Sequence, residues 1–340
     1  MKFIVFLKIY LFILFIGFFG LVKAQKIDDI KKKIDELSGW SDTNYVYRFP
    51  HRIVLSPTFF LRTNSFLIED VSGLGEDIIY KPNTPMKLAL SGSYKWLSLG
   101  FSFKLPSYLN DKGNTESFSL YLGTQTHFAN WGLDFFFIKN QGYYLSNPED
   151  LIDGWTDRDP YPFRSDLKTL NIGFSSHIVL SRKLSLKAAL NQTEKQLKSA
   201  GGFAIQVGMN YSNLRNDTSL IPASQQEFYQ DVTLFRKGGY VSVNIRPGYA
   251  YTYVYKDFYS TSFLLAGIGM LVQSYELDSK RSYGAQIMPQ FRFQQVLGYN
   301  TDNAFVKLMF VYNNYNYKVK KMRIRNNFVL ISLGGGIRIM

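Results

Sequence analysis

The chain has 340 residues, of which 46% are apolar, 19% charged and 17% aromatic, and its formal net charge is +13. It is too apolar for a disordered protein and more aromatic than an ordinary soluble enzyme. Because it contains no cysteine, disulfide scaffolds, cysteine zinc sites and thiol catalysis are excluded. Its three histidines, His51, His127 and His177, are far apart in the sequence, so we expect no metal centre and no other cofactor.

Residues 1–24 have the pattern of a secretory signal peptide. Lys2 gives a positive start, an apolar run up to Val22 is interrupted only by Lys8, and Ala24 ends a small-residue exit. A membrane anchor is the alternative, which Lys8 disfavours. Beyond residue 24 the sequence has no run of about 18 apolar residues, so we expect no spanning helix there. Cleavage would remove three lysines and leave a basic mature chain.

A leader of residues 25–50 follows, with one short amphipathic helix predicted over residues 26–39. Its apolar side chains recur at three- and four-residue steps. They are Ile27, Ile30, Ile34 and Leu37. Gly39 ends the pattern. The narrow apolar stripe allows two interpretations, a solvated periplasmic helix or a helix that acts as a plug or binds a partner.

From residue 51 onward the hydrophobic period changes from 3.6 to 2. Segments of about ten residues alternate polar with apolar side chains between turn-rich stretches, which is typical of a transmembrane β-barrel. The candidate strands are 51–62, 86–93, 95–105, 116–127, 131–144, 167–180, 184–192, 202–213, 239–253, 257–271, 283–297, 304–317 and 326–340.

The links between these candidates do not fit two membrane sides consistently. Counted back from the end of the chain, the long stretch 214–238 lies outside, whereas counted forward from residue 51 it lies inside. One candidate between residues 165 and 213 is therefore not a full strand, or two form one bent strand. We predict an all-β, antiparallel transmembrane barrel over residues 51–340 with about twelve strands, in a range of roughly ten to fourteen.

Two further features favour a membrane location. Tyrosines cluster at residues 251–255 and 312–317, where aromatic girdles are expected at the membrane interfaces. The final candidate strand alternates to the end of the chain, as expected of the strand that the barrel-assembly machinery recognises. It ends in Met340, where an aromatic residue is usual.

Several short motifs carry a resemblance to a known family. They are Ala24-Gln25 at the signal end, Tyr80-Lys81-Pro82-Asn83, Tyr94 to Gly100, Gly142-Tyr143-Tyr144 and Asn191 to Gln196. With these motifs the mature chain resembles an uncharacterised outer-membrane β-barrel family, of unknown function, of Bacteroidetes-type bacteria. The resemblance implies a fold and a location, and it implies no reaction.

The polar side chains expected to face the lumen are mainly cationic. They are Arg52, Arg62, Lys87, Lys104, Lys187, Arg246, Arg292, Lys307 and Arg338, against Asp134. Rings of Arg and Lys inside a low-dielectric wall favour anions. The candidate anion-binding residues are Arg246, Arg292, Lys307 and Arg338. The alternative is that these side chains cross-link a narrow interior.

A second hypothesis is a lipid- or acyl-modifying enzyme. Ser175 and His177 share the inner face of one candidate strand, as a nucleophile and its general base must. Asp134 or Glu194 would supply the acid and His127 is a second candidate base, but the spacing selects none of them. Because serine is common on every inner face, coincidence is the alternative.

The polar run 191–202 neither alternates nor has the composition of a plain turn. It is either a polar loop or a cluster folded into the barrel mouth. The second interpretation makes Glu194, Lys195, Gln196 and Lys198 groups that bind a ligand or form internal salt bridges.

These observations together predict an outer-membrane protein of a Gram-negative bacterium. We expect a narrow pore, a binding barrel or a structural barrel with a cationic lumen, and the enzyme as the alternative. The expected partners are outer-membrane lipids, including anionic head groups, the barrel-assembly machinery and a small anionic solute. Nucleic acid is not expected as a partner, because the basic chain is exported.

Overall fold

The computed structural model describes residues 41–49, 51–84, 86–94, 97–105, 112–113, 115–125, 131–278 and 280–339. The predicted signal peptide, the predicted leader helix and His127 lie outside these residues. The segment Ser41–Met340 forms one compact unit. Within the described ranges, no helix has the length and hydropathy needed to cross a membrane.

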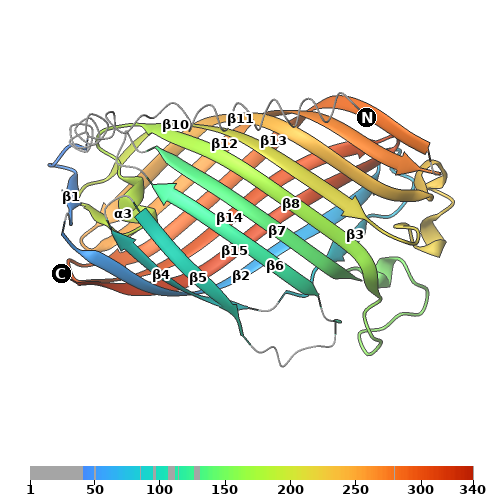
Figure 1. Cartoon of the computed structure of the whole chain (residues 1–340), viewed down its shortest axis with the longest axis horizontal. Helices are drawn as coiled ribbons and strands as arrows, with labels where there is room; N and C mark the ends of the chain where they lie inside the picture. Colours follow the sequence, from blue (N-terminus) through green and yellow to red (C-terminus); the bar gives the residue numbers. More distant parts are fainter. Residues whose placement is uncertain are drawn as a thin grey trace, which may run out of the picture. The chain divides into compact units, whose positions relative to one another are not determined.

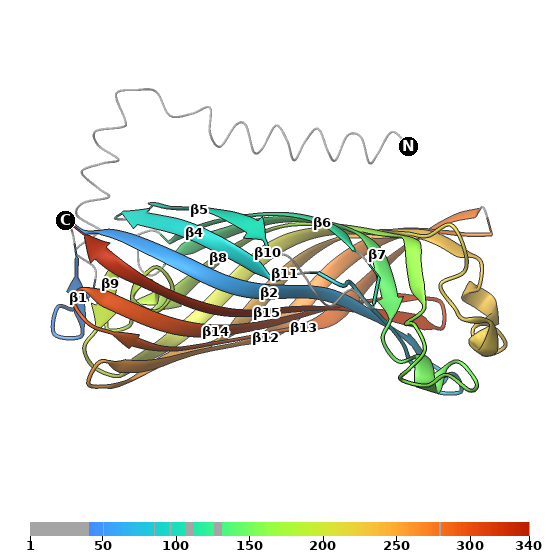
Figure 2. The same cartoon turned by 90° about the horizontal axis from the view of Figure 1, so that it is seen from below.

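Thirteen strands form one antiparallel sheet, and they run obliquely around a barrel (Figures 1 and 2). They are β2 (Ile53–Asp70), β3 (Ile78–Lys81), β4 (Lys87–Tyr94), β5 (Leu97–Lys104), β6 (Glu116–Gln125), β7 (Gly132–Leu145), β8 (Phe163–Leu180), β10 (Ala200–Arg215), β11 (Phe235–Tyr255), β12 (Phe258–Leu277), β13 (Lys280–Asn300), β14 (Ala304–Val319) and β15 (Met322–Ile339).

Ten of these strands close into a ring. β15 pairs with β2, and the short β3 joins β2 to β7, so the hydrogen-bonded path returns to its start. β4 and β5 extend from β2 beside the ring, and β6 pairs with β7. The ring has ten strands, the lower limit of the predicted range of ten to fourteen, because β4, β5 and β6 lie outside it. The closure between β2 and β7 consists of three residue pairs of β3 with β2 and two with β7. In the described residues β5 and β6 are each paired along one edge only.

The two ends of the barrel differ in their connections. The short-turn end, on the left in Figure 1, carries the turns at 256–257 and 301–303 and the helix α3 (Leu186–Leu190). It also carries β9 (Glu194–Gln196), which pairs with β1 (Val46–Arg48). The long-loop end carries segments 71–77, 146–162 and 216–234. These segments include the 3₁₀ turns η1 (Pro148–Asp150), η2 (Ala223–Gln225) and η3 (Gln230–Val232).

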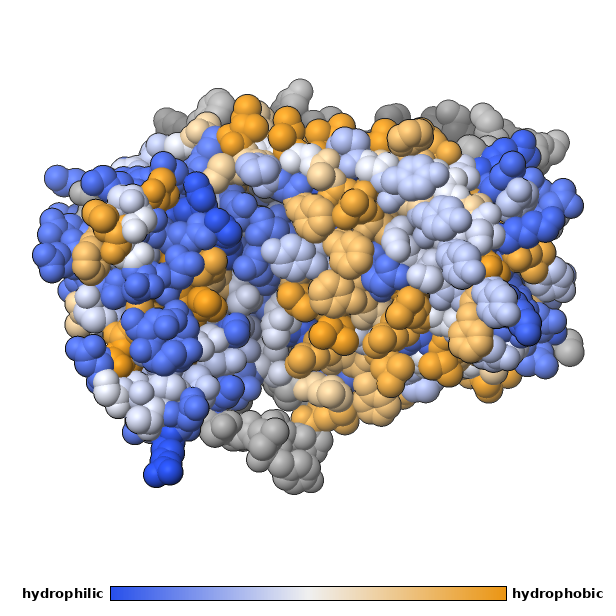
Figure 3. All heavy atoms as spheres, turned by 180° about the vertical axis from the view of Figure 1, so that it is seen from behind, coloured by the Kyte–Doolittle hydropathy of each residue, from blue (hydrophilic) through white to orange (hydrophobic). Residues whose placement is uncertain are grey.

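Side chains alternate between the lumen and the outside of the barrel. On β11, Val243 and Ile245 are both 49% exposed, whereas Asn244 between them is 3% exposed. On β15, Leu333 is 53% exposed and its neighbour Ser332 is 4% exposed. The exposed apolar side chains form a band, visible as the orange region on the face in Figure 3. The predicted assignment of polar faces to the lumen is thus confirmed on these strands, and a contiguous apolar surface marks contact with an apolar environment.

At the long-loop end the same strands reverse this polarity. Phe66 and Ile68 of β2 and Ile324 of β15 are at most 1% exposed inside the barrel. On the outside, Arg323 and Arg325 of β15 form ion pairs with the same carboxylate, Glu69 of β2. The strands therefore enclose an apolar core beyond the apolar band.

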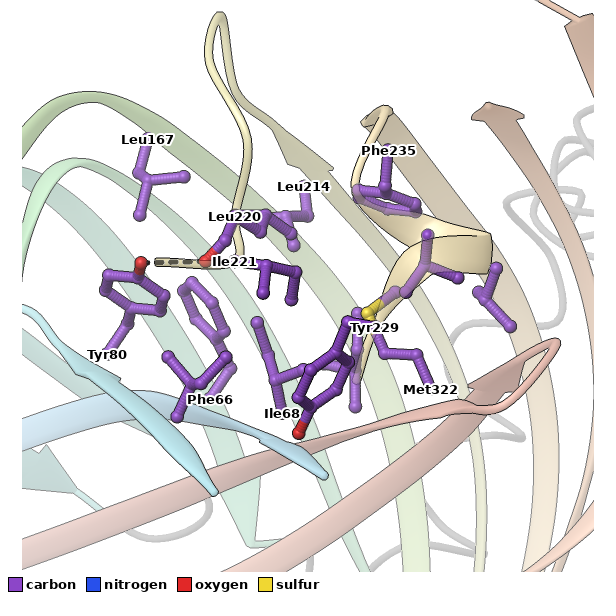
Figure 4. Packing of buried hydrophobic residues seen from close by; sticks show 14 of the residues in the cluster. Phe66, Ile68, Tyr80, Leu167, Leu214, Leu220, Ile221, Tyr229, Phe235 and Met322 are labelled. Carbon is purple, nitrogen blue, oxygen red and sulfur yellow. Dashed lines mark hydrogen bonds between the residues drawn. The ribbon is translucent and has the colours of Figure 1, made fainter. Parts of the chain in front are cut away.

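Segment 216–234 folds into this core and closes the long-loop end (Figure 4). Leu220 and Ile221 are at most 2% exposed and lie against Phe66 and Tyr80 of the wall. The hydroxyl of Tyr80 donates a hydrogen bond to the carbonyl oxygen of Leu220 at 2.8 Å. Tyr229 enters the same cluster from the far part of the segment. We call this cluster, with segment 216–234, the apolar lid.

The predicted strand 184–192 is wrong, because this segment contains α3. Ser185 precedes the helix, and its Oγ accepts a hydrogen bond from the Ala188 amide at 3.1 Å, so it acts as an N-cap. Leu184 and Leu186 fit a period of two, yet both are buried inside the barrel. Because this segment is not a strand, segment 216–234 lies at the same end of the barrel as 71–77 and 146–162. The forward and backward counts of the connections then agree.

The predicted aromatic girdle at 312–317 is only partly correct. Tyr312 faces outward and packs near Phe291, but Tyr317 is 3% exposed in the lumen and stacks on Tyr240 at 4.9 Å between ring centroids. Tyr315 also faces inward, toward Arg246. These tyrosines belong to the part of β14 where the lumen becomes apolar. The girdle at 251–255 is present, because Tyr251, Tyr253 and Tyr255 are 43–59% exposed.

Leu220→Ala tests the packing of the apolar lid. Loss of this fully buried side chain should cost about 2–5 kcal/mol, so amide exchange over residues 217–233 should accelerate at least tenfold in hydrogen–deuterium exchange. Leu234→Ala is the matched control, because Leu234 is 46% exposed. Equal exchange rates in the two variants would contradict the lid.

Candidate functional site

The connection between β8 and β10 fills the short-turn end of the lumen, and we call residues 181–199 the plug. Its side chains Leu184 and Leu186 are 0% exposed. They belong to a cluster with Val179, Ala200, Ala204, Ala250, Phe263 and Leu265 of the wall. A second contact joins Ala189 of α3 to Tyr259 and Val296. The plug therefore occupies the lumen through apolar packing at its start and along its helix.

Two predicted anion-binding residues, Arg338 and Lys307, hold the plug. Arg338 donates hydrogen bonds to Gln192 O (2.8 Å), Thr301 O (2.7 Å) and Asn300 Oδ1 (2.6 Å). Its guanidinium lies 4.2 Å from the centroid of the Phe49 ring. Lys307 Nζ donates to the carbonyl oxygen of Leu190, the last residue of α3. Both cations thus donate hydrogen bonds to backbone carbonyl oxygens of the plug rather than pointing into open space.

The plug carries a buried charge cluster around Glu194. This side chain is 2% exposed and accepts a hydrogen bond from Ser185 Oγ at 2.5 Å. Lys187 Nζ lies 3.4 Å from its Oε1, and Arg48 Nε lies 3.8 Å from the same oxygen. Burial lowers the pKa of Lys187 to about 8, and the negative charge of Glu194 opposes part of that shift.

The structure agrees with the folded-cluster interpretation for only part of the polar run 191–202, because Lys198 is exposed and residues 200–202 belong to β10. Glu194 and Gln196 are buried, and Gln196 Oε1 accepts a hydrogen bond from the Ser185 amide at 2.9 Å. Lys195 instead pairs with Asp257 at 2.9 Å near the surface.

Between the plug and the apolar lid lies a ring of buried polar side chains that we call the polar belt. Its members are Gln206 and Asn210 of β10, Ser242, Asn244 and Arg246 of β11, Gln290 of β13 and Asn313 of β14, each at most 5% exposed. Gln206 is the register partner of Arg246. Glycine at 208 leaves room for this packing, since a Cβ there would lie 3.1 Å from Asn244 Oδ1.

Arg246 carries a buried positive charge at the centre of the polar belt. It is 1% exposed, and in the described part of the chain its Nε and Nη1 have no hydrogen-bond partner and no carboxylate within 4.0 Å. Its guanidinium lies 5.6 Å from the centroid of the Tyr315 ring. An arginine keeps its charge at any ordinary pH. An unpaired buried charge is costly. The polar belt also holds acceptor oxygens that have no partner among the described residues, on Gln206, Asn210, Asn244, Gln290 and Asn313.

The structure does not bring the four predicted anion-binding residues into one cluster. Arg246 and Arg292 face the lumen from β11 and β13, which β12 separates, and Arg292 donates to Gln294 Oε1 at 2.8 Å. Lys307 and Arg338 lie at the plug. Two other lumen cations predicted from the sequence, Arg62 and Lys87, line a separate small pocket together with Asn64 and Asn140.

Ser175 and His177 lie on the inner face of β8 as predicted, beside a carboxylate. His177 Nδ1 is 3.4 Å from Asp134 Oδ2, and Asp134 is the register partner of Ser175. Gln206 Nε2 donates to Ser175 Oγ at 3.1 Å. Of the two acids considered, Asp134 is beside His177, whereas Glu194 belongs to the plug. The geometry places a carboxylate, Asp134, beside the histidine, His177, and these are the base and the acid of a catalytic triad.

Sequence reasoning placed Gln206, Asn244 and Gln290 on polar faces without assigning them to a site. The period of two predicts that each of these side chains faces inward. That the three lie at the same height in the lumen depends on the registers between β10, β11, β12 and β13. The plug was missed because Leu184 to Leu190 satisfies the strand period. Ser185, three residues before Ala188, was the available signal for a helix start.

Lys187→Met tests the charge cluster of the plug. The docked plug holds Lys187 at a pKa of about 8 against 10.5 when undocked, so docking releases a proton between these pH values. The free energy of docking of the plug therefore becomes more favourable as the pH rises through this window, by on the order of 3 kcal/mol. Cleavage of the plug by subtilisin, corrected for the enzyme's rate on a reference peptide, should therefore slow from pH 8 to 10.5. The slope should vanish in Lys187→Met and persist in Lys183→Met, and an unchanged slope in Lys187→Met would contradict the assignment.

Comparison with solved structures finds similar barrels at low identity. They include the outer membrane protease OmpT from Escherichia coli, with 12% identity, 88% of this chain and 100% of that chain covered, and a TM-score of 0.38. The translocator domain of the autotransporter NalP from Neisseria meningitidis has 10% identity, 92% and 96% coverage and a TM-score of 0.33. The attachment invasion locus protein Ail of Yersinia pestis has 7% identity, 84% and 98% coverage and a TM-score of 0.24.

A comparison with curated proteins gives no match. The family described as Domain of unknown function (DUF4421) matches residues 40–338, a range that holds all the described strands except the last residue of β15, together with the plug and the apolar lid. The chain therefore belongs to the DUF4421 family.

Proposed function

We propose that this protein is an outer-membrane β-barrel of a Gram-negative bacterium, of the Bacteroidetes type that its motifs resemble, exported by residues 1–24. The apolar band supports this location. On β10 the outward side chains Phe203, Ile205, Val207, Met209 and Tyr211 are 37–71% exposed. The eight residue steps from the first to the last cover about 27 Å along a strand. At the usual tilt of about 35–45° this is about 20 Å of height, within a few ångströms of the apolar band of such barrels. The short-turn end then faces the periplasm and the long-loop end faces outward.

Within that barrel, the lumen is a closed, cationic binding chamber rather than an open pore. The plug fills its periplasmic end and the apolar lid its outer end. The single observation that carries the proposal is Arg246, a buried guanidinium whose Nε and Nη1 together carry three N–H groups without an acceptor in the described residues, and a full positive charge. A small anionic solute beside Arg246 supplies both the countercharge and the acceptors.

An ion-pair latch holds the apolar lid to the wall. Arg164 Nε and Nη2 donate to both carboxylate oxygens of Asp166, each at 2.8 Å, and Nη2 also donates to Thr218 Oγ1 at 2.6 Å. Asp166 Oδ2 accepts from the amide of Asp217 at 2.9 Å. Release of this latch would leave segment 216–234 held only by its apolar packing and would favour openings that connect the polar belt with the outside.

Planar-bilayer conductance tests the closed chamber. Wild-type protein should insert without conducting, whereas Arg164→Gln with Asp166→Asn should give intermittent steps that prefer anions, because lid release exposes Arg246. Adding Arg246→Gln should lower the anion-to-cation permeability ratio severalfold. The matched control is Arg158→Gln with Asp157→Asn in segment 146–162, which should stay silent. Open wild-type channels, or an anion preference that survives Arg246→Gln, would contradict the proposal.

The second candidate is the lipid- or acyl-modifying enzyme, which the contact between His177 and Asp134 favours. In that case Ser175→Ala should reduce hydrolysis of a short-chain nitrophenyl ester by at least a thousandfold, since it removes the nucleophile. Ser176→Ala is the matched control, because Ser176 faces outward and accepts a hydrogen bond from Trp131 Nε1 at 2.5 Å. No hydrolysis by the wild-type barrel, or equal rates in the two variants, would exclude this candidate.

A further inference from the structure

Three basic side chains lie side by side on the outer face of the barrel. Lys168 of β8 is the register partner of Arg215 of β10, and Arg215 is the register partner of Lys237 of β11. They point outward, because the adjacent Leu167 and Leu214 are at most 4% exposed inside the barrel. We call Lys168, Arg215 and Lys237 the basic row.

The basic row is electrostatically unfavourable by itself. Like charges directly opposite each other on strands about 5 Å apart repel. In the described residues no carboxylate lies within 4.0 Å of any of the three. Glu276 of β12 is next in register after Lys237 but forms no ion pair with it, and Asp166, two residues from Lys168, is engaged by Arg164. The row therefore favours an anion from outside the chain.

The row lies directly beyond the apolar band, toward the long-loop end. On β8 the outward face changes from Phe174 through Leu170 to Lys168. On β10 the band ends with Tyr211, two outward positions before Arg215. An aromatic residue followed by cations is the order expected where hydrocarbon gives way to lipid headgroups.

We propose that the basic row binds the phosphate groups of a phosphorylated glycolipid in the outer leaflet. The proposal rests on the proposed membrane location, since the row needs a headgroup at that height. Arg215 Nε donates to Asn213 Oδ1 at 3.0 Å, which leaves its two Nη groups to meet a phosphate through paired N–H groups. Lys168 and Lys237 flank it as point charges, and the row spans about 10 Å, two strand spacings. The long-loop end faces the leaflet that carries such glycolipids, which selects this lipid over the phospholipids of the inner leaflet.

The test is lipid-dependent stability of the refolded full chain in nanodiscs. The variant carries Lys168→Gln, Arg215→Gln and Lys237→Gln. The matched control carries Lys256→Gln, Lys320→Gln and Lys321→Gln, which remove the same charge at turns away from the row. Thermal unfolding, followed by heat-modifiable migration in gels, is recorded in phosphatidylcholine alone and with added lipid A, phosphatidylglycerol or inorganic phosphate.

Lipid A should raise the unfolding temperature of the wild type and the control. Its apparent affinity for the row variant should be about a hundredfold weaker, as loss of three surface cations implies. In phosphatidylcholine alone the row variant should unfold at the same or a higher temperature, because like charges are removed. Equal stabilisation of all three proteins by lipid A would overturn the proposal, as would equal effects of phosphatidylglycerol or of phosphate alone. A chain that folds only in detergent-free buffer would instead refute the membrane location itself.

Discussion

The closure of the sheet between the first long strand and the last is the constraint on which the other features depend. β2 and β15 pair along nearly their whole lengths, although they stand at opposite ends of the barrel sequence. Inside a membrane every backbone N–H and C=O must find a partner within the protein, and closure is the way a sheet achieves this. Once the ring is closed, every second side chain of a strand must fit inside a lumen of fixed width. The plug, the polar belt and the apolar lid fill that lumen.

The lumen is divided into three layers by the changing polarity of the same strands. On β2 the inward series runs from Ser56 and Asn64 to Phe66 and Ile68. The outer face changes in the opposite sense, from apolar to charged, as Glu69 shows. Strands of 16–21 residues such as β10 to β15 exceed the length needed for spanning, and the excess builds an apolar core that holds segment 216–234. The polar belt is left between two closed ends.

The period of two predicted most of the fold, because it reports directly which face of a strand meets the apolar surroundings. Val243 and Leu333 were assigned to the outside for this reason. The same period was misleading for Leu184 to Leu190, because a short capped helix can match it by chance. It was also misleading for Tyr317, because at the long-loop end the lumen is apolar and an aromatic side chain there faces inward. β3 was too short to show a period. Of the candidate site, the inward positions of Arg246 and His177 were predictable, whereas the pairing of His177 with Asp134 depends on a register that no single strand encodes.

Arg338 links the attachment of the plug to the pairing of the last strand. It belongs to the final strand, yet its guanidinium holds Gln192 of the plug, and Asn300 beside it. The plug can therefore reach its final contacts only after β15 has paired with its neighbours. Until that step the plug lacks the hydrogen bond from Arg338, and its apolar packing and the bond from Lys307 Nζ are what hold it in the lumen. Pairing of the last strand thus completes both the barrel wall and the attachments of the plug.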